Sequence, residues 1–174
     1  GPVIGVMGAL TREKGQVTVV NALPCLPRSV RLVLIGDGPE RATLEETARS
    51  LGVLDRIVFA GFRTETSVLW PAFDLAVAPS RHEGLGTAVL EAMAAGVPVV
   101  AAAIGAFREV LKDGTAGALV APEDVEGMAS TVAGLLEDAE ARGSLARAGL
   151  IRVKDYSTEN MVLGTESVYM DLEV

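Results

Sequence analysis

The sequence predicts a single α/β domain over residues 1–174, built on a doubly wound parallel sheet of six strands with helices on both faces. The main observation is that short apolar, β-prone runs alternate with longer stretches of helical pattern, as in repeated βαβ units. Nearly half of the residues (49%) are apolar but only 4% are aromatic, so Ala, Val, Leu and Ile must fill the core. Such a core is usual for helices packed on a parallel sheet.

The expected elements alternate along the whole chain. The expected strands are 2–8, 31–36, 56–61, 75–79, 97–102 and 118–120. The expected helices are 14–26, 40–51, 65–71, 87–95, 106–111, 123–137, 139–149 and 158–172. Most strands end on Gly or Pro, which favours turns that leave room for a ligand at the carboxyl edge of the sheet. In open α/β sheets, ligands bind at that edge.

Composition and cysteine usage exclude several classes of protein. The longest uncharged stretch, residues 92–107, is interrupted by Gly and Pro and is too short to span a membrane. Cys25 is the only cysteine, so no internal disulfide can form, and no signal peptide opens the chain. We therefore expect a soluble, cytosolic protein.

The net charge of −8 argues against a nucleic-acid-binding role, and the charge is unevenly distributed. Residues 1–63 carry a net charge of +2, residues 64–120 one of −3 and residues 121–174 one of −7. Only the first third offers a mildly positive surface, so an anionic ligand is expected there. The acidic last third is expected to be a solvated helical face.

The turn after the first strand, residues 8–15, is the first candidate for chemistry. A turn of this kind presents backbone N–H groups and a helix N-terminus to an anion, and Lys14 adds a point charge. The alternative is a solvated lysine, because the spacing is neither G-x-G-x-x-G nor a Walker A loop. In the turn at 36–41, structural need accounts for the glycines and for Pro39.

The loop and helix at residues 79–95 carry the most informative pattern. Glu91 lies on a helix otherwise made of Ala, Val, Leu and Met, where a carboxylate is costly unless something hydrogen-bonds it. A pair of ligand hydroxyls is one such partner. Glu83 lies in the loop just before the helix, whose N-terminus stabilises negative charge. Because the chain has fifteen glutamates, their spacing of eight residues proves nothing by itself.

His82, the only histidine, is either a loop donor to a substrate or an ordinary surface residue. With Cys25 as the one cysteine, it cannot assemble a Cys/His metal site, and no Asp-x-Asp pair is present. No metal site is therefore predicted. A nucleophilic triad is not indicated either, because the chain has no Gly-x-Ser-x-Gly motif.

Both ends of the chain lead us to expect a fragment of a larger protein. The chain opens directly on a buried strand without an initiator Met, and it closes with a helix that Ser157 caps. This helix either packs its apolar stripe on its own domain or docks it on a missing one. The stripe consists of Met161, Thr165, Val168 and Leu172.

In this order, the segments resemble the C-terminal, donor-binding half of the family 4 retaining glycosyltransferases of the GT-B fold. The resemblance runs nearly end to end, and its signals are modest one by one but highly specific together. It is carried by turns 8–15 and 34–41, strands 55–61 and 73–80, the E-x7-E motif from Glu83 to Glu91, the EAMAAGVPVV run, and residues 103–109 and 114–122. It implies a single Rossmann-like domain, half of a GT-B enzyme.

The resemblance also implies roles for particular residues. Lys14 and the backbone of residues 84–87 would stabilise a departing diphosphate without a metal. Glu91 would hold the ribose hydroxyls, Glu83 would lie near the donor sugar, and Arg63 would lie near the base. Glu83 and Lys14 are thus the expected catalytic residues. The expected donor-binding residues are Gly8, Arg12, Lys14, Arg63, Ser80, His82, Gly84, Leu85, Gly86, Thr87 and Glu91.

Three features depart from the family pattern. Ala9 stands where many members carry Arg, which leaves Lys14 with Arg12 as a substitute. Gly105-Ala106 replaces the usual Gly-Gly near the last turn. The family's N-terminal domain, which binds the acceptor, is missing from these residues.

The expected function is that of the donor-binding half of a hexosyltransferase that transfers a sugar from a nucleoside-diphosphate sugar with retention of configuration. The fragment alone is expected to be inactive. The alternatives are a non-catalytic nucleotide-sugar-binding module and the donor half of a GT-B sugar epimerase.

No cofactor is expected beyond the donor substrate, and no nucleic acid or membrane span. The expected location is cytoplasmic, with peripheral attachment to the inner membrane surface left open for the full-length enzyme. Residues 158–174 are expected to cross to the missing domain.

Overall fold

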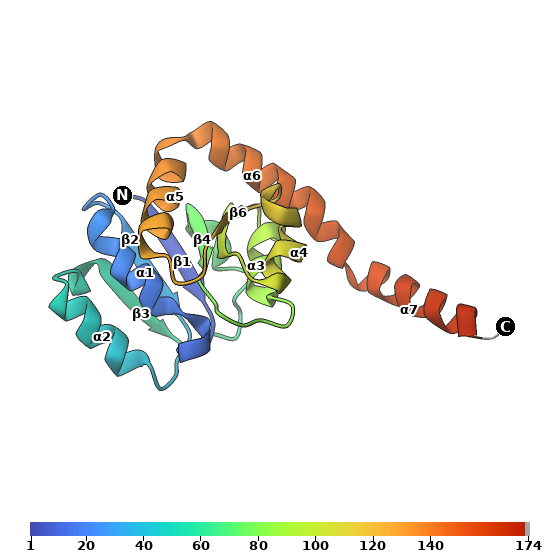
Figure 1. Ribbon diagram of the computed structural model, residues 1–174, viewed down its shortest axis with the longest axis horizontal. Helices are drawn as coiled ribbons and strands as arrows, with labels where there is room; N and C mark the ends of the chain where they lie inside the picture. The colour runs from blue at the N-terminus through green and yellow to red at the C-terminus, as the bar shows by residue number, and fades with distance from the viewer. Residues whose placement is uncertain (173–174) are drawn as a thin grey trace.

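The computed structural model of the chain describes residues 1–172 and confirms the predicted fold class (Figure 1). The domain is Rossmann-like, with a six-stranded sheet in the order β3-β2-β1-β4-β5-β6, and all neighbouring strands are parallel. Each strand lies within two residues of its expected bounds. The strands are β1 (Val3–Met7), β2 (Arg31–Ile35), β3 (Ile57–Gly61), β4 (Leu75–Ala78), β5 (Val99–Ala102) and β6 (Ala118–Val120).

The strand order makes the sheet doubly wound. The chain runs outward from β1 to β2 and β3, and then returns to the other side of β1 to add β4, β5 and β6. In β1, Ile4 pairs with Leu32 of β2 on one side and with Leu75 of β4 on the other. The connections after β1 and β4 therefore leave on opposite faces, which opens a crevice at the carboxyl edge between these strands.

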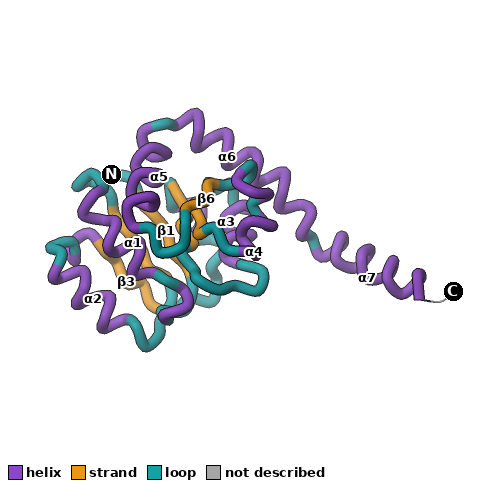
Figure 2. The backbone as a smooth tube through the Cα atoms, viewed as in Figure 1, coloured by secondary structure: helices purple, strands orange, loops and turns teal. Residues whose placement is uncertain are grey.

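Helices cover both faces of the sheet, as Figure 2 shows. Helices α1, α2 and α5 pack on one face, and α3, α4 and the end of α6 pack on the other. The side chains of Asp124 and Asp138 cap α5 and α6 by accepting backbone N–H bonds of 2.8 Å. The helices are α1 (Gln16–Ala22), α2 (Arg41–Ser50), α3 (Thr87–Ala94), α4 (Gly105–Val110), α5 (Val125–Glu137), α6 (Ala139–Arg152) and α7 (Thr158–Leu172).

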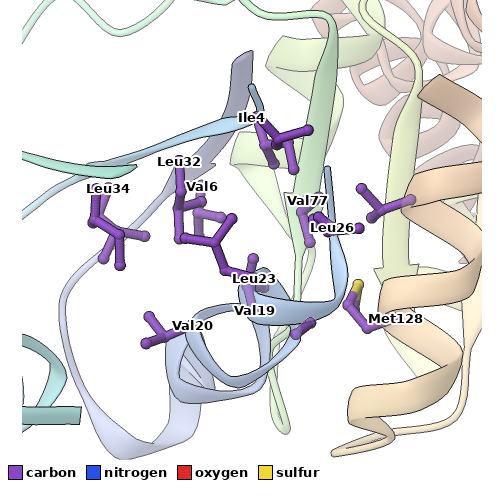
Figure 3. Packing of buried hydrophobic residues seen from close by; sticks show 14 of the residues in the cluster. Ile4, Val6, Val19, Val20, Leu23, Leu26, Leu32, Leu34, Val77 and Met128 are labelled. Carbon is purple, nitrogen blue, oxygen red and sulfur yellow. The ribbon is translucent and has the colours of Figure 1, made fainter. Parts of the chain in front are cut away.

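The core has two layers because side chains alternate across the sheet. Ile4 and Val6 of β1 point to the face of α1, where they pack with Val19 and with Met128 of α5 (Figure 3). On the other face, Phe107 and Met93 pack with Val99 and Ala101 of β5, among other residues. Burying each such side chain stabilises the fold by about 1.5–3 kcal/mol, so the two layers fix the sheet on which the loops of the carboxyl edge stand.

Two expected helices are corrected by the structure. The helix predicted over residues 65–71 is wrong, because this segment is a loop that leads into a short 3₁₀ helix, Trp70–Ala72. Pro71 has no N–H and fits only the first turn of a helix, so a helix starts at this point instead of ending there. The helix predicted over 14–26 is shortened to α1, since Gly15 takes a left-handed φ of 64° at its start and Pro24 falls in a 3₁₀ turn after it.

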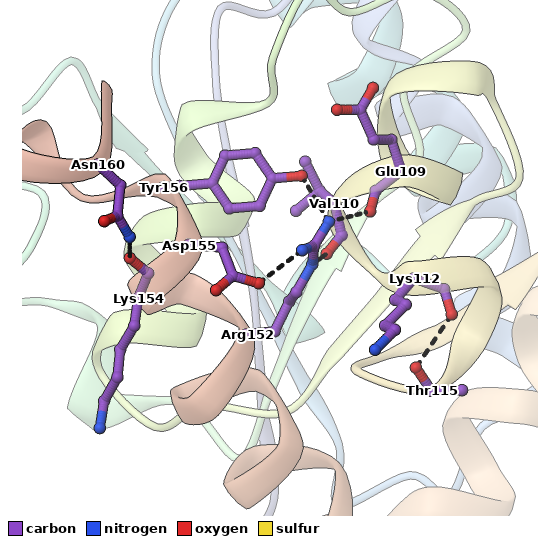
Figure 4. A network of polar contacts seen from close by, with 9 residues as sticks. All are labelled: Glu109, Val110, Lys112, Thr115, Arg152, Lys154, Asp155, Tyr156 and Asn160. Carbon is purple, nitrogen blue, oxygen red and sulfur yellow. Dashed lines mark hydrogen bonds and ion pairs between the residues drawn. The ribbon is translucent and has the colours of Figure 1, made fainter. Parts of the chain in front are cut away.

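Arg152, the last residue of α6, ties this helix to the end of α4 (Figure 4). Its guanidinium donates to the carbonyls of Val110 (3.2 Å) and Glu109 (2.9 Å). It also donates to the Asp155 carboxylate at 2.7 Å and to the Tyr156 hydroxyl at 2.9 Å. Four acceptors on two segments therefore hold this single side chain, which fixes the end of α6 and the turn that leads to α7.

Helix α7 extends away from the rest of the domain (Figures 1 and 2). The Ser157 hydroxyl accepts the backbone N–H of Asn160 at 3.2 Å, which confirms the predicted cap. In the predicted stripe, Met161 is 64% exposed and Val168 is 60% exposed, and Thr165 is exposed too, so these side chains do not pack on this domain. The Leu172 side chain lies outside the described residues. Within residues 1–172, no helix is long and apolar enough to cross a membrane.

Candidate functional site

The floor of the candidate site is formed where the turns after β1 and β2 cross. The N–H of Gly8 donates to the carbonyl of Ile35 at 2.9 Å, and the N–H of Leu10 donates to the carbonyl of Asp37 at 3.0 Å. Gly36 has a φ of 136°, and a Cβ on it would lie 2.0 Å from the carbonyl oxygen of Gly8. Only glycine fits there, so the two turns can meet at the carboxyl edge only because this residue has no side chain.

Lys14 and Glu83 form an ion pair above this floor. The Lys14 Nζ lies 2.5 Å from Glu83 Oε1, and the same oxygen accepts the Ser80 hydroxyl at 3.0 Å. The two side chains are 31% and 16% exposed, so the pair is largely shielded from water but reachable from it. The structure thus joins the two predicted catalytic residues, which lie in separate loops 69 residues apart in the sequence.

The N-terminus of α3 lines a small cavity that also contains Lys14 and Glu83 in its wall. Gly86, its N-cap residue, has a φ of 78°, and a Cβ there would lie 2.5 Å from Cε1 of Phe107. No side chain caps the first turn of α3. The backbone N–H groups of Thr87 and Ala88 therefore have no side-chain acceptor and can donate to an anion, in the geometry that favours phosphate at helix N-termini.

Glu91 lies on α3 and is half-buried. Its Oε2 accepts the Thr66 hydroxyl at 2.8 Å and the Trp70 indole N–H at 3.2 Å. Ligand hydroxyls are one partner that the sequence suggests for Glu91, and the structure adds two side chains of the protein that hydrogen-bond this carboxylate. Oε1 has no donor within the described residues, so one oxygen of this fixed carboxylate stays open to a ligand.

A largely apolar pocket of about 170 Å³, here called the edge pocket, lies beside the crossing turns. Arg63 and Thr66 from the loop after β3 form one side, and Gly8 and Ala9 form the other. Phe62 stands at its rim with 73% of its side chain exposed. Met7 lines both this pocket and the small cavity around Lys14 and Glu83, so the two hollows adjoin at the end of β1.

The structure brings most of the predicted residues together at the carboxyl edge of the sheet. Lys14, Ser80, Glu83 and Gly86 surround the small cavity, Gly8 and Arg63 line the edge pocket, and Thr66 connects that pocket to Glu91. Other predicted residues remain on the exposed rim, and no side-chain hydrogen bond to the described residues holds them. They are Arg12, His82, Gly84, Leu85 and Thr87.

His82 lies close to the turn that carries Glu13. The pKa of Glu13 is lowered, first by its own backbone N–H and by the Thr11 hydroxyl, and to a smaller extent by the charges of His82 and Arg12. The N–H of Arg81 also donates to the carbonyl of Glu13 at 2.7 Å. The loop after β4 is thus fixed against the turn after β1, which keeps Glu83 near Lys14.

Several residues of the site were not found from the sequence. Thr66 and Trp70 were assigned to a helix and not to the surroundings of Glu91. Gln16 is 2% exposed, lines the small cavity and donates to the carbonyl of Ala9 at 2.9 Å. Its position directly after Gly15, at the start of a helix, is the feature of the sequence that could have indicated a place in the site. Within residues 1–172, no group of three or more His, Cys, Asp or Glu side chains is placed to hold a metal ion.

A model of the family described as "Glycosyl transferases group 1" matches residues 1–138. The 2-deoxystreptamine glucosyltransferase of Streptomyces kanamyceticus is 38% identical over 143 residues, which are 79% of this chain and 37% of that protein. LpsE, a lipopolysaccharide core biosynthesis glycosyltransferase of Rhizobium meliloti, is 38% identical over 148 residues, which are 85% of this chain and 43% of that protein. The chain therefore spans less than half the length of these two relatives.

Two solved structures share this fold over about half of their length. The crystal structure of Anabaena Alr3699/HepE in complex with UDP and glucose has a TM-score of 0.91 and is 28% identical, over 97% of this chain and 48% of that one. A sucrose-phosphate synthase from Thermosynechococcus elongatus has a TM-score of 0.88 at 29% identity, over 98% and 45%. With the family match over residues 1–138, the chain belongs to the group 1 glycosyl transferases.

Proposed function

We propose that this domain is the donor-binding half of a family 4 retaining glycosyltransferase, and that a nucleoside-diphosphate sugar binds across the carboxyl edge of its sheet. One observation carries the proposal. A lysine–glutamate pair at the open N-terminus of a helix adjoins an apolar pocket, so that a place for a phosphate lies next to a place for a flat base. HepE of Anabaena, which shares the fold, was crystallised with UDP and glucose.

The diphosphate of the donor is expected to contact Lys14 and the backbone N–H groups of residues 84–87. In the transfer, the bond between the anomeric carbon and the phosphate oxygen breaks, and the electron pair leaves with the diphosphate. The positive charge of Lys14 and the N-terminus of α3 would stabilise that developing charge, and no metal is needed for this. Glu83 forms an ion pair with Lys14, so the diphosphate would compete with this carboxylate for the ammonium group.

The nucleoside is expected to bind at the other end of the site, around Glu91 and the edge pocket. Glu91 is fixed through one oxygen by Thr66 and Trp70, which leaves the other oxygen for the ribose hydroxyls. The edge pocket would take the base between Phe62, Arg63 and the crossing turns. Glu83 would then lie near the sugar, within reach of the site where the bond breaks. Arg12 and His82, on the rim, would contact the outer phosphate and the sugar.

The acceptor site is expected on a second, N-terminal domain of the full-length enzyme. Retaining transfer requires donor and acceptor in one closed geometry, and a single sheet edge leaves the donor open to water. We propose that α7 crosses to that domain and that its exposed stripe packs there. The whole enzyme would need no cofactor besides its donor and would act in the cytoplasm, either free or attached to the inner membrane surface.

Calorimetric titration with a panel of nucleoside diphosphates tests the donor assignment directly. We expect one diphosphate to bind clearly better than its nucleoside and better than the other diphosphates. Equal binding of all diphosphates and of inorganic pyrophosphate would contradict a nucleotide site.

Activity separates the enzyme from the two alternatives. Residues 1–174 alone should bind the donor nucleotide but transfer no sugar, whereas the longer chain should transfer it to an acceptor with the donor's anomeric configuration, as read by NMR. A non-catalytic module would show no transfer even in the longer chain. An epimerase would release an altered sugar without any acceptor. Acceptor-dependent turnover by residues 1–174 alone would contradict the proposal of a half enzyme.

A further inference from the structure

A second pocket, here called the arginine pocket, lies at the amino edge of the sheet. Its volume is about 330 Å³, at the lower end of the range for small-ligand sites. Its walls come from the segment before β2, the turn after α2 and the turn before β3. Because the donor site follows the carboxyl ends of the strands, the two sites lie at opposite edges of the domain.

Arg56 is the buried arginine of this pocket, with only 7% of the residue exposed. Its Nε donates to the carbonyl of Val30 at 3.2 Å, and its Nη2 donates to the carbonyls of Pro27 (2.9 Å) and Leu26 (3.3 Å). These carbonyls orient the guanidinium but do not neutralise its charge. Within residues 1–172, no carboxylate forms a salt bridge with Arg56. A buried charge without a counter-ion is costly, so the surroundings of Arg56 favour an anion.

Arg28 and Arg31 bring two more positive charges to the same pocket. Both are exposed, neither forms an ion pair within the described part of the chain, and Arg31 Nη1 donates to the carbonyl of Arg28 at 3.1 Å. Asp55 is the one acidic residue in the lining, which leaves a net charge of +2 around the pocket. Burial lowers the pKa of Arg56, the charges of Arg31 and Arg28 lower it further, and Asp55 acts in the opposite direction. The guanidinium groups therefore repel one another, and an anion between them would remove that repulsion.

We infer that the arginine pocket binds a phosphate group, either as a free phosphate or as the phosphomonoester of a small molecule or of a lipid head group. The planar fork of a guanidinium matches two oxygens of a phosphate, and arginines from two separate segments can contact different oxygens of the same group. Three of the eight basic residues of the mildly positive first third lie here. The inference does not depend on the proposed donor site, which uses other residues.

Titration of the ¹⁵N-labelled chain with sodium phosphate, at constant ionic strength, tests the inference residue by residue. We expect saturable amide shifts at Arg31, Gly52 and Arg56, with an affinity in roughly the millimolar range. The double variant Arg28→Gln/Arg31→Gln should weaken binding about tenfold, because it removes two charge-assisted contacts. It leaves Arg56 and its three carbonyl bonds intact, so folding should be preserved.

The matched control is Arg147→Gln/Lys154→Gln, which removes the same charge from exposed positions outside the pocket. It should leave the affinity within about twofold of the parent. Shifts confined to residues 84–87 would mean that phosphate binds only at the donor edge, and this would overturn the inference. Equal affinities in the double variant and the parent, or no saturation by 50 mM phosphate, would overturn it as well. Nucleoside-diphosphate binding, measured on the same samples, reports separately on the proposed function.

Two further arms identify the source of the phosphate. In one, glycerol 3-phosphate replaces inorganic phosphate. In the other, vesicles of phosphatidylcholine with or without phosphatidic acid are added. Soluble ester binding without vesicle binding supports a small-molecule ligand. Binding of phosphatidic acid vesicles that soluble phosphate displaces supports a head group. Vesicle binding that soluble phosphate does not displace, with no shifts from phosphate alone, would overturn the compact site in favour of a diffuse basic surface.

Discussion

The two edges of the sheet differ in how their positive charges are paired. At the carboxyl edge, Lys14 is already paired with Glu83, and Glu91 is already bonded by Thr66 and Trp70. At the amino edge, three arginines share one pocket without an ion pair within the described residues. A ligand at the carboxyl edge must therefore compete with the partners that Lys14 and Glu91 already have. An anion at the amino edge would instead neutralise positive charge that has no counter-ion. The first arrangement suits a substrate that binds and dissociates, because Glu83 neutralises Lys14 and two side chains hydrogen-bond Glu91.

The largest expected effect comes from removing the one lysine of the carboxyl edge. Lys14→Ala should weaken binding of a nucleoside diphosphate about ten- to a hundredfold, since a hydrogen bond to a charged group contributes roughly 1.5–3 kcal/mol. Binding of the nucleoside without phosphate should hardly change. Calorimetry of both ligands measures the difference, with the exposed Lys154→Ala as the control. Equal losses for the two ligands would show that Lys14 is not a phosphate contact.

A smaller effect is expected from the fixed carboxylate. Glu91→Gln should weaken ribonucleotide binding about tenfold and spare the 2′,3′-dideoxy analogue, because the amide NH₂ cannot accept a hydrogen bond, either from the Trp70 indole or from the ribose hydroxyls. Trp70→Phe should give a weaker version of the same change, since it removes one hydrogen bond that orients Glu91. The exposed Glu109→Gln serves as the control, and thermal melts show whether the fold is intact. If the variant and the parent discriminate ribo from dideoxy ligands equally, Glu91 has only a structural role.

Glu83→Gln should act in the opposite direction. Removing the carboxylate that competes for Lys14 should raise the affinity for a nucleoside diphosphate by roughly two- to fivefold, in line with the modest free energy of a partly exposed ion pair. Sugar transfer by the longer chain should fall at the same time. Calorimetry and a turnover assay give the two readings. A loss of diphosphate affinity would show that Glu83 positions Lys14 instead of competing for it.

The smallest effect is expected at the far end of the chain. Ending the chain after Ser157 should change the melting temperature by no more than about 1–2 °C, because the described side chains of α7 are exposed and bury almost nothing on this domain. Amide exchange should be faster over residues 158–170 than in the strands. Strong protection of α7 in the isolated chain would mean that a second copy covers its stripe.

The sequence predicted the sheet, its strands and the main members of the candidate site because these depend on local patterns. Apolar runs determine the strands, and the position of a residue just after a strand places Lys14, Ser80 and Glu83 at one edge. The partners of Glu91 could not be predicted, since they depend on how the loop after β3 folds over α3. That loop was expected to be a helix, and the effect of Pro71 was missed. Charged residues far apart along the chain, such as those of the arginine pocket, meet only through the fold.

Arg152 gives α7 a mechanical connection to the donor edge. The guanidinium holds the carbonyls of Glu109 and Val110 at the end of α4, and Phe107 on the same helix lies against Gly86, the first residue before α3. A variant that removes the Arg152 guanidinium would therefore loosen α4 and its contact with Gly86, at the end of the loop that carries Glu83. The base of α7 and the loop proposed to contact the sugar are therefore linked by direct contacts through α4 and the start of α3.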